Sequence, residues 1–305
     1  MSIVTTAQAV PSRLFAIYAA LFESENGEVK DRLEAWATPP SLSGRGADDD
    51  GESTTTLFSN TLLEARRIGL VEEVEDKLRL TADARGGGKK GKGSEAYFLA
   101  FMRRTLFDPA RASETQQAGF MVALSWFLSS SPLRPMNFSE APQNTLKAQI
   151  GDHAPKTELT SLNRYQNFLY WARYLGFATI VGGGSDAEDD TSRRVIPDPV
   201  KAIESALPAI FSEGNDLPIE QFMTRLAAIF PVFETGSARQ DYEAMRLTPQ
   251  ADGDKRLSIT TSLALQRLVD RQRLTMATVA DAPGRILDFG PREGRVSRIA
   301  LQGAA

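Results

Sequence analysis

The chain has 305 residues, of which 42% are hydrophobic and 24% charged, a composition typical of a soluble globular protein with two or three domains. Its net charge of −4 excludes nucleic-acid binding through the whole surface, so any DNA contact requires local basic patches. The absence of cysteine excludes disulfides, cysteine-ligated metal centres and thiol catalysis, and the single histidine, His153, excludes a two-histidine metal site within one chain.

The sequence shows no membrane span and no secretion signal. No apolar run reaches the roughly 18–20 residues that a helix needs to cross a bilayer. The N-terminal segment lacks a basic region, and Arg13 interrupts its first apolar stretch, so it does not look like a signal peptide. We therefore expect a cytoplasmic protein without membrane contact.

Three helices and a hairpin are predicted within residues 1–84. Apolar residues at helical spacing predict a helix from Ser12, a short helix before Pro39-Pro40, and a third helix over residues 54–68, in which Leu63 is expected to face inward. Strand-like residues follow at 69–74 and 77–80. A helix that leads into a hairpin is how a winged helix ends, so this segment predicts one complete winged-helix module.

Residues 85–93 form a glycine- and lysine-rich linker. Gly86, Gly91 and Lys92 match most of a phosphate-binding loop. The position after the lysine is Gly93, however, where magnesium coordination requires Ser or Thr. A flexible cationic linker explains the composition better, so no nucleotide cofactor is expected.

The second predicted module spans residues 94–199 and is helical and winged-helix-like. Its last helix is expected over residues 161–175, followed by strand-like residues 176–181 and 194–196 around an acidic tip, Asp186-Ala187-Glu188-Asp189-Asp190. The tip lacks the central glycine and the final glutamate of a calcium-binding EF-hand. Its charge would repel phosphate, so we expect this hairpin not to lie along DNA.

The third predicted module spans residues 200–305 and is also winged-helix-like. Its last helix is expected over residues 259–273, followed by a hairpin of residues 274–279 and 285–289, with a further strand within 295–301. The fold class predicted for the chain is therefore mainly α with small β-hairpins, organised as tandem winged-helix, or helix-turn-helix, modules.

Candidates for catalysis are weak. Glu28-Val29-Lys30 and Glu75-Asp76-Lys77 match the short E-x-K half of a restriction-type nuclease site, but neither follows the aspartate that would share the metal ion. A lone histidine in a loop usually has no catalytic role. We therefore expect no catalytic residues, no metal site, no cofactor and no enzymatic activity.

Basic residues cluster where a winged helix presents its third helix. Arg66 and Arg67 end this helix in the first module, and Arg267, Arg271 and Arg273 end it in the last one. Arginine at such positions either contacts phosphate or only stabilises the negative end of the helix dipole. We expect nucleic-acid contact through these arginines. The predicted interface also includes the helix residues Thr55, Ser59 and Asn60 and the linker residues Lys89, Lys90 and Lys92, while Arg292, Arg295 and Arg298 follow the last hairpin.

Several short segments carry a resemblance to a known family. They are Pro11-Ser12-Arg13-Leu14, Ser41-Leu42, Ile68-Gly69-Leu70-Val71, the aromatic run at residues 120–127, and Arg295-Val296-Ser297-Arg298-Ile299. Together they resemble the DpdG family, whose members are encoded in bacterial clusters for deazapurine modification of DNA and associated restriction. The resemblance implies a non-catalytic accessory subunit of a multi-protein defence complex. The glycine-lysine linker and the acidic second hairpin depart from the family pattern.

The predicted function is that of a non-catalytic DNA-binding or adaptor subunit in a prokaryotic anti-phage defence or restriction complex. Its expected partners are double-stranded DNA and other proteins of the complex, with an ATPase, a helicase or a nuclease as candidates. Two alternatives stay open: a winged-helix transcriptional regulator, and a winged-helix accessory subunit of an SMC-like ATPase complex.

Overall fold

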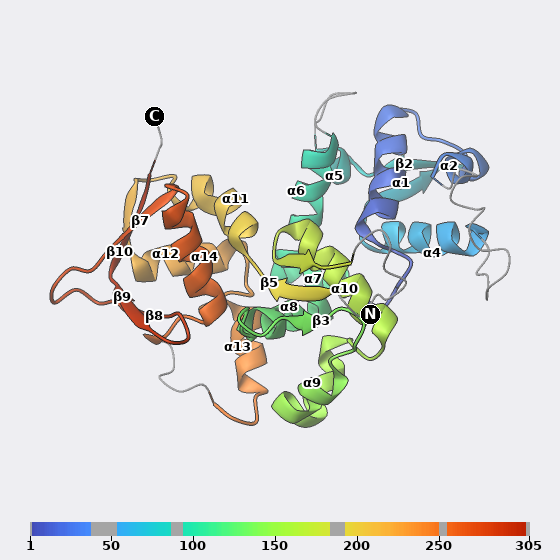
Figure 1. Ribbon diagram of the computed structural model, residues 1–305. Coiled ribbons are helices and arrows are strands. Elements are labelled where there is room, and N and C mark those ends of the chain that lie inside the picture. The colour runs from blue at the N-terminus through green and yellow to red at the C-terminus, as the bar shows by residue number, and fades with distance from the viewer. Residues whose placement is uncertain (1, 38–53, 87–93, 184–192, 250–254, 303–305) are drawn as a thin grey trace. The chain divides into compact units, whose positions relative to one another are not determined.

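The computed structural model describes residues 2–37, 54–86, 94–183, 193–249 and 255–302 (Figure 1). Within these residues helices predominate, and the strands form small antiparallel sheets of two or three strands. The predicted fold class, mainly α with small β-elements, is therefore confirmed. The chain forms two compact units, Met1–Gln117 and Ala118–Ala305. The predicted boundaries at residues 84, 93 and 199 stay predictions.

The first unit contains the expected three helices and hairpin, followed by further helices. Its first helix begins at Pro11, with Val10 at the cap, rather than at Ser12. Proline favours the first helical position because its missing N–H would have no helical partner there. The elements are α1 (Pro11–Glu23), α2 (Lys30–Ala37), α4 (Thr54–Arg67), β1 (Val71–Val74), β2 (Lys77–Leu80), α5 (Ala82–Arg85), α6 (Ser94–Phe107) and α7 (Pro109–Glu114).

A strand-like contact before α2 had no counterpart in the sequence-based prediction. Glu28 and Leu78 of β2 exchange two backbone hydrogen bonds of 2.8 Å in an antiparallel bridge. Gly27 has a φ of +74°, and a Cβ at this position would lie 2.7 Å from the Leu78 carbonyl oxygen, so the close approach requires glycine. β2 thus pairs both with β1 and with the segment in front of α2.

The α4 helix buries one face. Phe58, Leu62 and Ala65 are buried, whereas Leu63 is 67% exposed, so the prediction that Leu63 faces inward is wrong. Consecutive helical residues point about 100° apart. A helix that buries Leu62 therefore turns Leu63 toward solvent.

Aromatic rings join α1 and α6 in the core of the first unit. The ring centroids of Phe15 and Tyr18 lie 5.5 Å and 5.2 Å from the ring centroid of Phe98 in α6. Tyr18 is fully buried, and burial raises the pKa of its hydroxyl to about 12. This helix pair therefore depends on apolar packing around a neutral tyrosine.

Asp83 ties three helices of the first unit together. It lies in α5 and pairs with Arg104 of α6 at 3.1 Å and with Arg111 of α7. Partial burial acts to raise the pKa of Asp83, but the two arginines outweigh it and hold the pKa of this carboxyl below its usual range. The carboxylate form therefore stabilises this junction.

The second unit contains two further groups of helices and strands. The first group comprises α8 (Ala118–Ser129), β3 (Met136–Asn137), α9 (Gln143–Ile150), η1 (Gly151–Thr157), α10 (Leu162–Leu175), β4 (Ala178–Val181) and β5 (Arg194–Pro197). The second group comprises α11 (Val200–Ile210), β6 (Asp216–Pro218), α12 (Ile219–Ile229), α13 (Ser237–Ala244), α14 (Ile259–Asp270), β7 (Leu274–Ala277), β8 (Arg285–Asp288), β9 (Glu293–Val296) and β10 (Arg298–Leu301).

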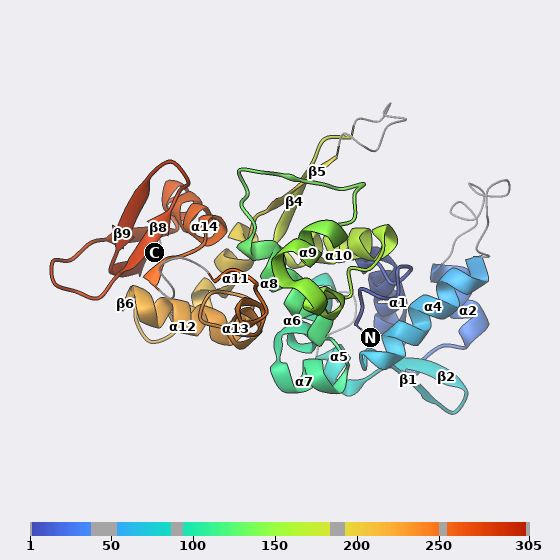
Figure 2. The same cartoon turned by 90° about the horizontal axis from the view of Figure 1, so that it is seen from below.

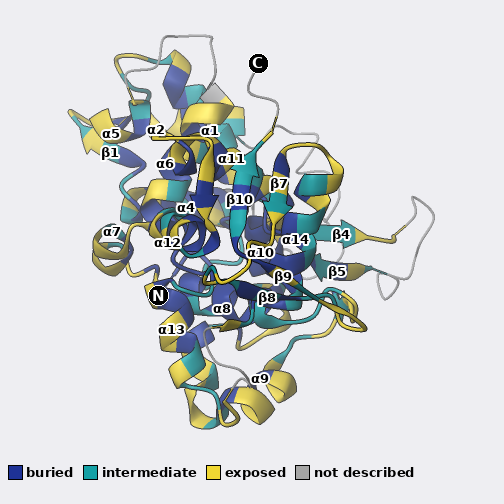
Figure 3. Cartoon of the chain, turned by 90° about the vertical axis from the view of Figure 1, so that its left-hand side faces the viewer, coloured by how far each residue is buried: buried dark blue, intermediate teal, exposed yellow. Residues whose placement is uncertain are grey.

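The α8 helix is the most deeply buried helix of its group (Figure 3). Its residues are apolar almost all round, and it buries both Trp126 and Phe127, as expected of a helix covered on every side. Despite this hydrophobicity α8 has only 12 residues. Within the described ranges, no helix is both long and apolar enough to cross a membrane.

The last hairpin differs from the prediction. β7 pairs with β10, not with β8, and β8 pairs with β9 in a sheet of their own (Figure 1). Ile299 of β10 is fully buried and lies opposite Leu217 of β6 and Met276 of β7. The predicted pairing of 274–279 with 285–289 is therefore wrong, because β10, which has no exposed residue, lies between β6 and β7.

One strand order recurs in the three groups of helices and strands. In the second unit the sheets run β3-β5-β4 and β6-β10-β7. In each sheet the short strand before the second helix of its group, β3 or β6, pairs with the last strand, β5 or β10. That last strand also pairs with the strand after the final helix, β4 or β7. The first unit repeats this order in reduced form, since Glu28 pairs with β2 and β2 pairs with β1.

Candidate nucleic-acid interface

The predicted contact residues of the first unit share one face of α4. Ser59, Asn60 and Arg67 are half-buried and Arg66 is exposed, with the exposed Leu63 between them along the helix. Spacings of three, four and seven residues place these side chains on one side of a helix. The predicted residue Thr55 belongs to α4, but its side chain lies outside the described part of the structure.

Carboxylates neutralise both arginines of this face. Arg66 pairs with Glu73 of β1, and both side chains are more than 40% exposed. Arg67 donates to Glu64 at 2.7 Å, and the Glu64 side chain is only 2% exposed. An exposed ion pair is weak and can exchange its carboxylate for a phosphate, whereas the buried Glu64 holds Arg67 in place.

The hairpin beside α4 is acidic. Residues 71–80 contain four acidic and two basic residues, and one of the basic ones, Arg79, pairs with Glu72 at 2.7 Å. The turn residues Glu75 and Asp76 have φ values of +51° and +60°, the pattern of a two-residue type I′ turn. Two carboxylates at the tip repel phosphate, so the hairpin of the first unit suits a protein surface better than DNA.

The linker lysines Lys89, Lys90 and Lys92 lie outside the described residues, as does the acidic segment 186–190. Nucleic-acid contact by these lysines therefore stays a prediction. The expectation that the second hairpin does not lie along DNA also stays a prediction. It is based on the acidic sequence of this hairpin, which would repel phosphate.

The arginines at the end of α14 also meet carboxylates. Arg267 lies 2.7 Å from Asp198, which follows β5, and Arg273 lies 3.1 Å from Glu204 in α11. Arg271 is exposed and forms no ion pair with any described residue. Of the three predicted contacts in the second unit, Arg271 is therefore the one whose charge is unmatched.

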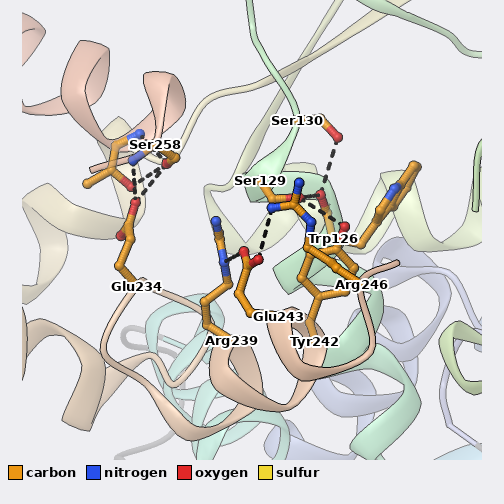
Figure 4. Close-up of polar contacts among 10 residues, drawn as sticks. Trp126, Ser129, Ser130, Glu234, Arg239, Tyr242, Glu243, Arg246 and Ser258 are labelled. Carbon is orange, nitrogen blue, oxygen red and sulfur yellow. Dashed lines mark hydrogen bonds and ion pairs between the residues drawn. The ribbon is translucent and has the colours of Figure 1, made fainter. Parts of the chain in front are cut away.

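The first turn of α14 is buried within the second unit (Figure 4). Ser258 caps the helix, because its hydroxyl accepts a hydrogen bond from the Thr261 backbone N–H at 3.2 Å and donates to Glu234 at 2.7 Å. The Thr260 hydroxyl donates to the Ser130 carbonyl oxygen at 2.7 Å. In a helix-turn-helix the N-terminal residues of the recognition helix contact the bases. The burial of this turn prevents α14 from reading a groove in that manner.

A polar cluster fastens α13 to α8 beside this turn (Figure 4). Glu243 accepts hydrogen bonds from Arg239 at 2.7 Å and from Arg246 at 2.9 Å. The Ser129 hydroxyl of α8 lies 3.4 Å from the Tyr242 hydroxyl, and burial raises the pKa of Tyr242. Glu243 thus holds both arginines at α13, and the contact between Ser129 and Tyr242 joins α13 to α8.

The charge of the chain is concentrated at one end. Residues 255–305 contain nine basic and four acidic residues, a net charge of +5, whereas the other residues contain 26 basic and 35 acidic ones, a net charge of −9. The net charge calculated by segment therefore reveals a basic C-terminal region that the net charge of the whole chain does not show. It directs attention to the C-terminal strands, where Arg292 and Arg295 lie in and beside β9.

Comparison with known proteins gives one match. A sequence model of the family described as DpdG-like matches residues 1–282. This family is associated with the cluster for deazapurine modification of DNA, so the resemblance noted from the sequence is confirmed. No curated protein and no solved structure shows significant similarity to the chain.

Proposed function

Since the chain belongs to the DpdG-like family, we propose that it is a non-catalytic subunit that links DNA to partner proteins in a prokaryotic defence or restriction complex. The single observation that carries this proposal is the strand order that recurs in the three groups. Family membership associates the chain with a DNA-modification cluster, and the repeated topology supports a role in binding.

We interpret the recurring order as that of a winged helix. In this fold a short strand precedes the second helix and pairs with the last strand, while the wing joins the last two strands. The β3-β5-β4 and β6-β10-β7 sheets follow this order, and the Glu28–Leu78 bridge provides the first strand in the first unit. A winged helix exposes one helix and one wing to its partner. This arrangement suits binding and not catalysis.

The chemistry of the candidate catalytic residues supports a non-catalytic role. Glu28 belongs to the bridge with β2 and lies 3.6 Å from Arg32, and Glu75 occupies the turn of the first hairpin. The lone His153 is exposed. Within the described ranges, no three His, Asp or Glu side chains are close enough to share a metal ion.

The two units differ in what they offer to partners. The α4 face combines paired arginines, small polar side chains and the exposed Leu63 beside an acidic hairpin, which favours a protein partner. The C-terminal segment carries the excess of positive charge, which favours DNA. In this proposal the N-terminal unit docks a protein of the complex and the C-terminal group holds DNA.

DNA binding is tested with the full chain. We expect affinity for labelled duplex DNA, measured by fluorescence anisotropy, to fall linearly on a log–log plot against salt, with a slope of about −0.9 for each phosphate contacted. Duplexes with and without deazapurine bases reveal whether the modification is recognised. An affinity that is absent or insensitive to salt would contradict direct DNA contact.

Protein docking is tested by co-purification with the other proteins of the modification cluster. Leu63→Asp places a charge on the α4 face, and since Leu63 is 67% exposed the fold should tolerate it. Leu247, which is 64% exposed in the second unit, provides the matched control Leu247→Asp. We expect the first variant to lose a partner that the second retains. Retention by both would rule out this docking face, and an ATPase partner without DNA affinity would support the SMC-like accessory alternative.

A further inference from the structure

The wing of the C-terminal group is not a simple turn. Between β7 and β10, the two strands that a wing joins, the chain inserts the complete β8–β9 hairpin. Two views show this hairpin on the side of α14 away from β4 and β5 (Figures 1 and 2). We propose that the β8–β9 hairpin is the DNA-contacting element of this chain and that Arg292 and Arg295 bind backbone phosphates. This inference rests on the proposed function and assigns its DNA contact to one surface.

The hairpin is held rigidly on the body of the second unit. The Leu257 N–H donates to the Ile286 carbonyl oxygen at 2.9 Å, and the Asp288 N–H donates to the Ser262 hydroxyl of α14 at 2.9 Å. At its base Arg285 is buried and donates to both carboxylate oxygens of Glu220, at 2.6–3.1 Å. A preorganised hairpin loses little conformational entropy when it binds a ligand. Less of the free energy of its contacts is therefore offset, and the affinity is higher.

Ion pairing separates the charges of the hairpin into matched and unmatched sets. Arg256, which precedes α14, lies 3.5 Å from Asp288 and 2.7 Å from Glu293, so both acids of the hairpin have Arg256 as an ion-pair partner. Arg292 and Arg295 are exposed, and neither forms an ion pair with a carboxylate in the part of the chain that the structure describes. The hairpin therefore presents two unmatched guanidinium groups, in contrast to Arg66, Arg67, Arg267 and Arg273.

The two guanidinium groups are oriented by their neighbours. The Arg292 guanidinium lies 5.4 Å from the ring centroid of Phe289, in the range of a cation–π contact. Arg295 donates one hydrogen bond, of 2.9 Å, to the Ala282 carbonyl oxygen. Because a guanidinium has five N–H donors, both side chains retain donors for phosphate oxygens. A two-stranded ribbon also has a shape that fits the major groove.

The other two wings are less suited to this role. The first ends in Glu75 and Asp76, and the loop of the second carries the acidic sequence of residues 186–190. Among the three wings, the C-terminal one is therefore the wing whose unmatched charges attract phosphate instead of repelling it.

The test compares two double variants of equal charge in the full chain. Arg292→Ala with Arg295→Ala removes the unmatched pair. The control, Arg79→Ala with Arg104→Ala, removes two exposed arginines that are paired with Glu72 and Asp83 in the first unit. The readout is the salt dependence of affinity for a duplex DNA, with melting temperatures to verify folding. Arg292→Ala alone serves as a second variant, because Arg292 donates no hydrogen bond to the described residues.

We expect the first double variant to bind roughly tenfold or more weakly at low salt and its salt slope to decrease by about 1.8, or 0.9 for each lost phosphate contact. The single variant should lose about half of that slope, and the control should keep the slope of the unmodified chain. If the unmodified chain binds DNA and the first double variant keeps its slope, the hairpin assignment is wrong while the proposed function stands. If the unmodified chain shows no salt-dependent affinity, both are wrong.

Discussion

Ile299 provides the sharpest test of the strand order in the C-terminal group. It is fully buried at the centre of the β6-β10-β7 sheet. Ile299→Ala removes three buried carbon atoms, at roughly 0.8 kcal/mol each, and leaves a cavity that raises the expected loss of stability to about 3 kcal/mol. For a unit of the size of Ala118–Ala305, about 3 kcal/mol lowers the melting temperature by roughly 6–12 °C.

The matched control is Ile286→Ala in β8, which makes the same chemical change at a half-buried position. We expect it to lower stability by about 1 kcal/mol or less, because less apolar area leaves water there on folding. Thermal unfolding of the full chain, followed by circular dichroism, measures both effects. The observed order buries Ile299 fully and leaves Ile286 half-buried. A loss for Ile286→Ala equal to or larger than that for Ile299→Ala would therefore refute the observed order.

Three further predictions concern local structure. Gly27→Ala should destabilise the first unit by about 1–3 kcal/mol in calorimetry, because its φ of +74° and its 2.7 Å approach to the Leu78 carbonyl oxygen exclude a Cβ; an unchanged melting temperature would contradict the bridge. Ser258→Ala should lower the stability of the second unit by about 1 kcal/mol in urea titrations through loss of the α14 cap, and no change would dismiss the cap. The lowered pKa of Asp83 means that its stabilising contribution is present above about pH 4 and is lost as pH falls through the folded-state value, so Asp83→Asn should flatten the acid side of the stability–pH curve; an unaltered curve would count against this ion pair.

Local signals identified most of the helices and two of the three predicted hairpins. Gly176 ends α10 in the left-handed conformation and Ser161 caps its start, and both features can be recognised from neighbouring residues alone. The β1–β2 and β4–β5 hairpins follow their helices after short connections, as predicted. The mainly α class and the family were therefore accessible from the sequence.

The candidate site was only partly accessible. The sequence placed Arg66, Arg67, Arg267 and Arg273 near the ends of the helices that precede the predicted hairpins, where the structure has them. It did not indicate that Arg267 and Arg273 meet carboxylates, because their partners Asp198 and Glu204 lie far from them in sequence. Whether an arginine is available to phosphate depends on such distant neighbours.

The sequence by itself determined which segments form most of the helices, which residues carry charge, and that no thiol chemistry is available, since these depend on residue type and on contacts within a few positions. Tertiary structure alone decided that β10 instead of β8 completes the last sheet, that Leu63 faces solvent, and that the start of α14 is buried. These outcomes follow from competition for burial among segments up to some 130 residues apart, as between Ser130 and Thr260, and no local pattern contains that information.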